Sequence, residues 1–416
     1  MSEDLFATNY ARRAAGFRPS PVRSVWDVAT APGMISLAGG NPDLRGLPLE
    51  AIGRVAQSLV AEHGQEALQY GSGAGVEALR HAVTGLMARS EIAADPEDVL
   101  ITAGSQMGIE LVTAMFCNPG DIILAESPTY VGAISTFVGL EAEVAHVECD
   151  EAGIVPERLA ARIQELRGAG RTIKFLYVIP NFNNPSGVRL SAERRPEVAR
   201  ICAEAGVIIV EDDPYGLISF DGTVTPAIRS FDENVIYLGS MSKIFSPGIR
   251  VGWVLAPANV RARLQLLAEA MVIHPSILSQ HLALEYLTNF GWEDTLASAT
   301  ERYHAQAEAL LGAIGGALPQ GSTWTRPVGG FFVWATLPEG YSADELFDLA
   351  VEEQVVFIPG SAFFADGSGT RNLRFSFSLE SPDTIREGMR RLARATQRLT
   401  APPTACERTD RVAPPG

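Results

Sequence analysis

Short apolar runs rich in β-branched residues alternate with stretches of helical character from about residue 65 to residue 257. Most positions within each run are apolar, which is typical of strands that are buried on both faces of a sheet. Strands of this kind alternate with helices when helices cover both faces of a mainly parallel sheet. We therefore expect an α/β fold. The runs are residues 99–102, 122–124, 175–178, 207–210, 235–238 and 251–254.

After Pro275 the sequence changes to longer helical stretches with fewer strands between them. A helix around residues 344–353 and a strand at residues 373–379 predict a smaller α+β domain. The chain has 416 residues, which suffices for a large domain with a smaller companion. We assign residues 1–50 to an N-terminal segment that joins the small domain, residues 51–285 to the large domain, residues 286–398 to the small domain and residues 399–416 to a disordered tail.

The composition is that of a folded globular protein with an acidic surface. The 49 acidic residues outnumber the 33 basic ones, and the formal net charge of -16 disfavours nucleic acid and anionic membranes as partners. No apolar stretch is long enough to span a membrane, and the N-terminus lacks the features of a signal peptide, so we expect a cytoplasmic protein. The cysteines lack metal-ligand spacing and predict no metal site. They are Cys117, Cys149, Cys202 and Cys406.

Polar residues follow several of the predicted strands at the point where each strand ends. In open α/β sheets, ligands bind beyond the carboxyl ends of the strands. One such loop is unremarkable, but five loops after successive strands indicate a single binding site. The loops are residues 104–106, 127–130, 181–187, 211–216 and 240–243.

The last of these loops ends in Lys243, beside the hydroxyl groups of Ser240 and Ser242. A lysine at the end of a strand can be partly desolvated, which lowers its pKa toward that of a nucleophilic amine. The two hydroxyls can bind a phosphate, and Arg250, seven positions after the lysine, adds a guanidinium that suits a dianion. Taken alone, the loop also fits an ordinary surface turn.

Three further loops carry residues whose chemistry is ambiguous when each is taken alone. Asp212 and Asp213 end a buried strand, and paired acids can bind magnesium, although the Pro-Tyr-Gly that follows argues against it. Asn184 is held extended by the next proline, so its amide can reach two partners or form a plain turn. Ser105 opens a helix whose free N–H groups can bind phosphate, or it is a simple cap.

Together, these loops and the segment from Ser240 to Trp253 resemble the fold-type I pyridoxal 5′-phosphate (PLP) enzymes, the class I/II or aspartate aminotransferase superfamily. Within it, the chain is most similar to the branch of 2-aminoadipate, kynurenine and aromatic aminotransferases. The resemblance runs from about Arg23 to about Leu392. It implies a large domain with a mainly parallel seven-stranded sheet, PLP as cofactor and a homodimer with shared active sites. It also implies transfer of an amino group between an L-amino acid and a 2-oxo acid through an aldimine on Lys243.

The resemblance implies a role for each motif residue around the cofactor. Lys243, Asp212 and Tyr215 are the expected catalytic residues, with Asp212 on the pyridine nitrogen and Tyr215 on the 3′-oxygen. Tyr130 is expected to stack on the ring, and Tyr70 to reach the phosphate of the neighbouring subunit. The residues expected to hold the phosphate are Ser105, Gln106, Ser240, Ser242 and Arg250.

Four residues are expected to contact the substrate. Arg374 is expected to bind the α-carboxylate, and Asn184 to contact both that carboxylate and the 3′-oxygen of the cofactor. Gly40 is expected to lie against the substrate. Arg23 aligns with an arginine that reads an acidic side chain in some relatives, and it fits a surface arginine equally well. Glu211 and Asp213 are expected to be solvated or structural.

Other functions stay compatible with the sequence. The nearest are other reactions on the same cofactor, those of a lyase, a decarboxylase or a racemase, because the motifs around the ring barely differ. A transcription regulator with an aminotransferase-like effector domain is disfavoured by the acidic charge and by a match that begins near Arg23. Asn183 stands where relatives often have Gln, and residues 41–48 depart from the related pattern. The amino donor and the 2-oxo acceptor are therefore not identified.

Overall fold

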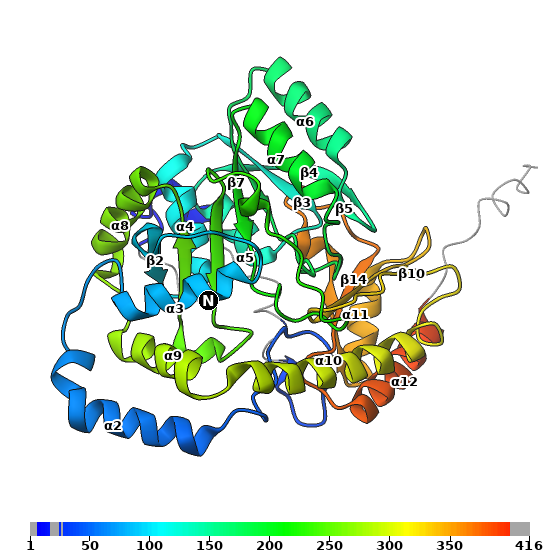
Figure 1. The fold of residues 1–416 in the computed structure, drawn as a ribbon. Coiled ribbons are helices and arrows are strands. Elements are labelled where there is room, and N and C mark those ends of the chain that lie inside the picture. The colour runs from blue at the N-terminus through cyan, green and yellow to red at the C-terminus, as the bar shows by residue number, and fades with distance from the viewer. Residues whose placement is uncertain (1–5, 17–24, 26–27, 400–416) are drawn as a thin grey trace, which may run out of the picture.

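A computed structural model describes residues 6–16, 25 and 28–399 of the chain (Figure 1). Arg23 and almost all of the tail predicted to be disordered, residues 400–416, lie outside the described residues. Within the described part, no helix is both long enough and apolar enough to cross a membrane.

An eight-stranded sheet lies at the centre of the large domain. Five neighbouring strands run parallel, while β9 is antiparallel to both of its neighbours. The expected α/β fold with a mainly parallel sheet is confirmed, and β5 is a two-residue eighth strand beyond the seven longer ones. In spatial order the strands are β2 (Val99–Thr102), β9 (Gly252–Leu255), β8 (Ile236–Ser240), β7 (Ile208–Asp212), β6 (Ile173–Val178), β3 (Ile122–Ser127), β4 (Glu143–Asp150) and β5 (Gly153–Ile154).

Helices cover both faces of this sheet, as the apolar runs predicted. On β6, the side chains of Phe175 and Tyr177 join a core with α3, α4, α5 and α8, whereas Leu176 and Val178 face a second core with α6 and α7. The helices of this domain are α2 (Leu49–Ala67), α3 (Glu77–Ala88), α4 (Ser105–Phe116), α5 (Val131–Gly139), α6 (Pro156–Gly168), α7 (Arg194–Glu204), α8 (Ala258–Val272) and α9 (Ile277–Asn289).

The second body of structure is an antiparallel sheet with helices, at the right of Figure 1. Its α11 begins with a capping side chain, because the Ser342 hydroxyl accepts a hydrogen bond from the N–H of Glu345 at 3.3 Å. The four strands, in spatial order, are β10 (Thr323–Trp324), β11 (Phe332–Thr336), β14 (Asn372–Ser376) and β13 (Ile358–Pro359). The helices are α10 (Trp292–Ile314), α11 (Ala343–Glu352) and α12 (Pro382–Arg398).

The N-terminal segment pairs with this second body. Strand β1 (Ile35–Ser36) runs parallel to β12 (Val355–Val356) in a separate two-stranded sheet.

The predicted domain boundaries stay predictions, and residue 285, the predicted end of the large domain, lies within α9. Short 3-10 helices complete the described elements, namely η1 (Arg12–Gly16), η2 (Pro96–Asp98), η3 (Ile228–Ser230), η4 (Pro247–Ile249) and η5 (Gly360–Phe363).

Candidate active site

A cavity of about 320 Å³ lies where the carboxyl ends of the parallel strands meet the second body of structure. Most of the residues predicted to form the site line it, although they come from segments far apart in the sequence. The polar loops after successive strands therefore converge as expected for an open α/β sheet. The predicted residues in the lining are Gly40, Ser105, Gln106, Tyr130, Asn184, Asp212, Tyr215, Ser240, Ser242, Lys243, Arg250 and Arg374.

Lys243 lies just beyond the end of β8, with its amine inside the cavity. Its Nζ donates a hydrogen bond to the backbone oxygen of Gly40 at 2.8 Å. Burial, and then the positive charges of Arg374 and Arg250, lower the pKa of Lys243 to about 8. The amine therefore loses its proton far more readily than an exposed lysine, which is what a nucleophilic or proton-transferring amine requires.

Asp212 is the last residue of β7 and is only 3% exposed. One carboxylate oxygen, Oδ2, accepts a hydrogen bond from the phenol of Tyr177 at 2.7 Å. The other, Oδ1, has no hydrogen-bond partner among the described residues. Burial raises the pKa of Asp212 to about 7, against the opposing effect of the hydrogen bond from Tyr177. A buried carboxylate oxygen without a donor fits the protonated pyridine nitrogen of PLP.

The start of α4 and the loop after β8 form a site that suits a phosphate. Gly104 precedes the helix with φ of 79°, and a Cβ atom there would meet the Arg250 guanidinium at 2.3 Å. That guanidinium donates to the backbone oxygen of Ala103 at 3.0 Å. The hydroxyl of Ser240 donates to that of Ser242 at 2.9 Å. A helix N-terminus, a guanidinium and two hydroxyls together can bind a dianion.

Arg374 lies on β14 of the second body of structure and lines the cavity. The residue is 2% exposed. Its Nη1 donates to Oδ1 of Asn184 at 2.8 Å, and its Nη2 donates to the backbone oxygen of Ala38. Its Nε has no partner among the described residues. Burial lowers the pKa of Arg374 to about 10, but it is still charged at neutral pH. Such a guanidinium is suited to bind a substrate carboxylate.

Two tyrosines line the same cavity. Burial raises the pKa of Tyr215 above its usual value, so its phenol is a proton donor at neutral pH. Tyr130 comes just before α5, and a Cβ atom on Gly132 would lie 2.4 Å from its ring, so that position requires a glycine. Gln106 lines the cavity, but its amide donates to the hydroxyl of Thr136 at 2.9 Å, which ties α4 to α5.

Three of the discussed residues lie outside the cavity or have a structural role. Tyr70 is 74% exposed and does not line the cavity, and its ring contacts His274 edge-on at 5.7 Å between centroids. Glu211 and Asp213, on either side of Asp212, are buried and therefore structural rather than solvated. The Glu211 carboxylate accepts two backbone N–H groups, at 2.9 and 2.8 Å, and Asp213 accepts the N–H of Gly216 at 2.9 Å.

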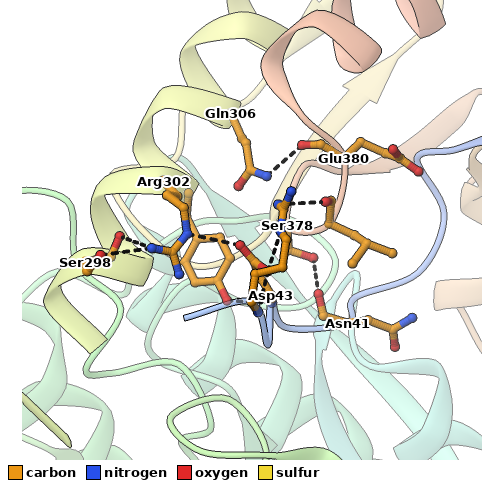
Figure 2. A network of polar contacts seen from close by, with 10 residues as sticks. Asn41, Asp43, Ser298, Arg302, Gln306, Ser378 and Glu380 are labelled. Carbon is orange, nitrogen blue, oxygen red and sulfur yellow. Dashed lines mark hydrogen bonds and ion pairs between the residues drawn. The ribbon is translucent and has the colours of Figure 1, made fainter. Parts of the chain in front are cut away.

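The segment after β1 runs across the cavity and supplies backbone oxygens to it. The oxygen of Ala38 accepts from Arg374, and that of Gly40 accepts from Lys243. One residue further on, the backbone oxygen of Asn41 accepts a hydrogen bond from the Ser378 hydroxyl at 2.6 Å (Figure 2). This segment therefore contributes one hydrogen-bond acceptor to the amine and one to the guanidinium.

Asp43 anchors the far end of this segment, as Figure 2 shows. Its carboxylate accepts from the Nε atoms of Arg45 at 2.8 Å and of Arg302 at 3.0 Å, and from the backbone N–H of Arg45 at 3.0 Å. Its own N–H donates to the phenol of Tyr303 at 2.9 Å. Burial alone would raise the pKa of Asp43, but the hydrogen bonds outweigh it and the pKa lies below its usual value.

The fold and the cavity thus define a fold-type I PLP-dependent enzyme, with a buried amine, a buried carboxylate and a helix start that suits a phosphate. The model of the aminotransferase class I and II family matches residues 32–392. The chain belongs to this family, and it is a PLP-dependent aminotransferase that transfers an amino group between an amino acid and a 2-oxo acid.

Three relatives are similar along nearly the whole chain. Aromatic-amino-acid aminotransferase 1 of Thermococcus litoralis is 35% identical over 387 residues, 92% of this chain and 93% of its own length. The structure of a multiple substrate aminotransferase from Thermococcus profundus is 34% identical, with a TM-score of 0.89 and coverage of 95% and 99%. The α-aminoadipate aminotransferase of Thermus thermophilus, complexed with N-(5′-phosphopyridoxyl)-L-leucine, is 34% identical, with a TM-score of 0.87 and coverage of 95% and 98%.

Proposed function

We propose that Lys243 is the lysine that binds PLP covalently and that it then carries a proton between the substrate α-carbon and the C4′ carbon of the cofactor. The observation that supports this most is the arrangement of three groups in one cavity. They are the amine of Lys243, the unpartnered Oδ1 of Asp212 and the unpartnered Nε of Arg374. The three match the reactive carbon, the ring nitrogen and the α-carboxylate of a PLP-bound amino acid.

When bound, PLP supplies a ring that stabilises negative charge at the substrate α-carbon. Asp212 pairs with the ring nitrogen and keeps it protonated, while the phenol of Tyr215 donates to the 3′-oxygen. Asn184 contacts that oxygen and, with Arg374, the α-carboxylate. Tyr130 lines the cavity and would stack on the ring, which would orient the substrate α-carbon relative to it.

The phosphate is held at the other end of the cavity by Arg250 and by the start of α4. Ser105 is the first residue of α4, so its backbone N–H would bind the phosphate there, and Ser240 and Ser242 line the same cavity. Gln106 orders this end through its hydrogen bond to α5. Because the net charge of the protein is -16, these local groups must provide the whole attraction for the phosphate.

We propose that the amino donors fall within the range covered by the names of the relatives, that is, aromatic amino acids and 2-aminoadipate. Among the described residues, the cations that line the cavity are Lys243, Arg250 and Arg374, and each already has a role at the cofactor or the α-carboxylate. Binding the side-chain carboxylate of an acidic substrate therefore needs a further cation, and we propose Arg23 for this role. An aromatic side chain needs no such cation, and Phe332 and Gly40, which both line the cavity, offer it apolar surface.

A spectroscopic half-reaction screen tests this function. The purified enzyme is mixed with single amino acids, and loss of the visible absorption band of the lysine-bound cofactor reports amino transfer, while 2-oxo acids restore the band. We expect aromatic donors and 2-aminoadipate to react, and Arg23→Ala to lose 2-aminoadipate alone. Arg13→Ala, an exposed arginine of η1, is the matched control. If no amino acid converts the cofactor to its amine form, the proposed roles in amino transfer are wrong.

We also propose a homodimer in which Tyr70 reaches the phosphate bound by the partner. The exposure of Tyr70 supports this, because the residue is 74% exposed even with His274 packed edge-on against its ring. Large apolar side chains near it are exposed too, and a group of this kind is typical of a protein interface. They are Leu68 at 63%, Met271 at 43%, Val272 at 47% and Ile273 at 54% exposed.

Mixed dimers test the shared site. Tyr70→Phe and Lys243→Ala subunits each form weak or dead homodimers, but a mixed dimer contains one site with both native residues. We expect activity to return when the two variants are unfolded and refolded together. No recovery, or a monomer by analytical ultracentrifugation, would show that the sites are not shared.

We retain the cytoplasm as the proposed location of this enzyme.

A further inference from the structure

Tyr177 was predicted only as part of an apolar strand, and its phenol has a polar partner that the prediction missed. It lies on β6 and is fully buried. Its register partner on β7 is Val210, and Asp212 lies two residues further on, so both side chains are on the same face of the sheet. The phenol donates to Oδ2 of Asp212 at 2.7 Å.

The ring of Tyr177 alone does not account for a tyrosine at this position. Phe175, on the same face of the same strand, packs edge-on against Phe137 at 5.8 Å, and Tyr177 packs against the same ring at 5.5 Å. A phenylalanine serves this packing at position 175 and could serve it at 177. The hydroxyl is the difference, and its hydrogen-bond partner is Asp212.

The hydrogen bond has a fixed direction. Burial, and then the nearby charge of Asp212, raise the pKa of Tyr177 well above its usual value, with smaller effects from Tyr130 and Glu126. The phenol therefore keeps its proton and donates it, while the carboxylate accepts. Oδ2 is occupied, which leaves Oδ1 as the oxygen without a partner in the cavity lining.

We propose that Tyr177 is a positioning residue that sets the orientation of Asp212 and keeps the shared proton on the cofactor's ring nitrogen. This inference rests on the proposed function, in which Oδ1 of Asp212 faces that nitrogen. A proton between a carboxylate and a pyridine nitrogen resides on the group with the higher proton affinity. A donated hydrogen bond stabilises the carboxylate anion and lowers its proton affinity, so the proton stays on the nitrogen.

Nitrogen-15 NMR of the enzyme reconstituted with ring-labelled PLP measures this proton directly. We expect a protonated ring nitrogen in the native enzyme and an unprotonated one in Asp212→Asn. In Tyr177→Phe the signal is expected to move part of the way toward that of Asp212→Asn. Tyr237→Phe is the matched control, because this buried phenol donates to Asp213 at 3.2 Å instead, and its signal should stay at the native position.

The NMR outcomes separate the two proposals. If Asp212→Asn shifts the signal but Tyr177→Phe does not, the inference about Tyr177 is overturned and the role of Asp212 stands. If Asp212→Asn itself leaves the signal unchanged, the proposed role of Asp212 fails first. Circular dichroism confirms that each variant is folded before its spectrum is compared.

A binding measurement without covalent attachment provides a second readout. Calorimetric titration of the apoprotein with pyridoxamine 5′-phosphate, which cannot attach to Lys243, should give about tenfold weaker binding for Tyr177→Phe, the scale of a hydrogen bond to a charged group. Should Tyr177→Phe fail to fold, a fluorinated tyrosine at position 177 retains the phenol and donates more strongly. It is then expected to tighten binding, and weaker or unchanged binding would overturn the proposal.

Discussion

The buried carboxylate of Asp43 allows a prediction that links stability to the geometry of the site. Asp43→Ala removes the carboxylate that accepts hydrogen bonds from the guanidinium groups of Arg45 and Arg302. The side chain of Asp43 is 1% exposed, while those of Arg45 and Arg302 are 63% and 34% exposed. The substitution thus removes a buried negative charge, but the guanidinium groups of Arg45 and Arg302 that remain are partly exposed to water.

The size of the effect follows from this unequal burial. Breaking a fully buried ion pair costs about 3–5 kcal/mol, whereas an exposed pair contributes about 0–1 kcal/mol. Because Arg302 also donates to the backbone oxygen of Ser298 and both cations are partly hydrated, we expect about 3 kcal/mol for Asp43→Ala, at the lower limit of the buried case. Asp43→Asn retains one acceptor oxygen and should cost about half of that.

Urea denaturation of the holoenzyme at pH 7 and at acidic pH measures these differences. The pKa of Asp43 is lowered in the folded state, so its stabilising effect is complete above the unfolded pKa of about 4 and is lost as the pH falls through the folded value. The gap between native and Asp43→Ala enzymes should therefore close in acid. Asp383→Asn is the control, because this carboxylate is 96% exposed in its pair with Arg386, and it should change little. A loss below about 1 kcal/mol for Asp43→Ala, or a gap independent of pH, would refute the reasoning.

Three further predictions concern the cofactor and substrate sites. The rate at which PLP attaches to the apoprotein should rise about tenfold per pH unit and level off near pH 8, because only the neutral amine of Lys243 reacts; a plateau near pH 10 would contradict the lowered pKa. Arg374→Lys should lower kcat/KM for amino acids about 30-fold with an unchanged cofactor spectrum, since the planar fork is lost; equal activity would remove its carboxylate role. Gly104→Ala should weaken PLP binding because its Cβ displaces the Arg250 guanidinium, whereas Gly120→Ala, with a similar φ of 83° and nothing within 4 Å, should bind normally in an equilibrium dialysis assay.

The sheet was largely predictable because most of its strands are buried on both faces. Strand β4 was not predicted, since its exposed and buried positions alternate and its sequence includes Glu143 and Glu148. The convergence of the polar loops was predictable for a physical reason, namely that the carboxyl ends of parallel strands meet at one edge of the sheet. The sequence alone therefore predicts that the loops with Asp212 and Lys243 belong to one site.

The parts that were missed depend on contacts distant in sequence. Tyr177 lies within an apolar run, and only the register between β6 and β7 shows that its phenol meets Asp212. Asp43 and Arg302 are separated by 259 positions, so no local pattern predicts their ion pair. The apolar run and the short polar segment each look ordinary in sequence, because the information lies in the tertiary packing.

The proposed amino transfer requires covalent attachment of the cofactor to Lys243. The chain has two lysines, and the other, Lys174, pairs with Asp121 at 3.3 Å outside the cavity. Borohydride reduction of the holoenzyme followed by peptide mass spectrometry should place the reduced cofactor on the peptide that contains Lys243, and leave Lys174 unmodified. A label on Lys174, or none on either lysine, would contradict the central claim.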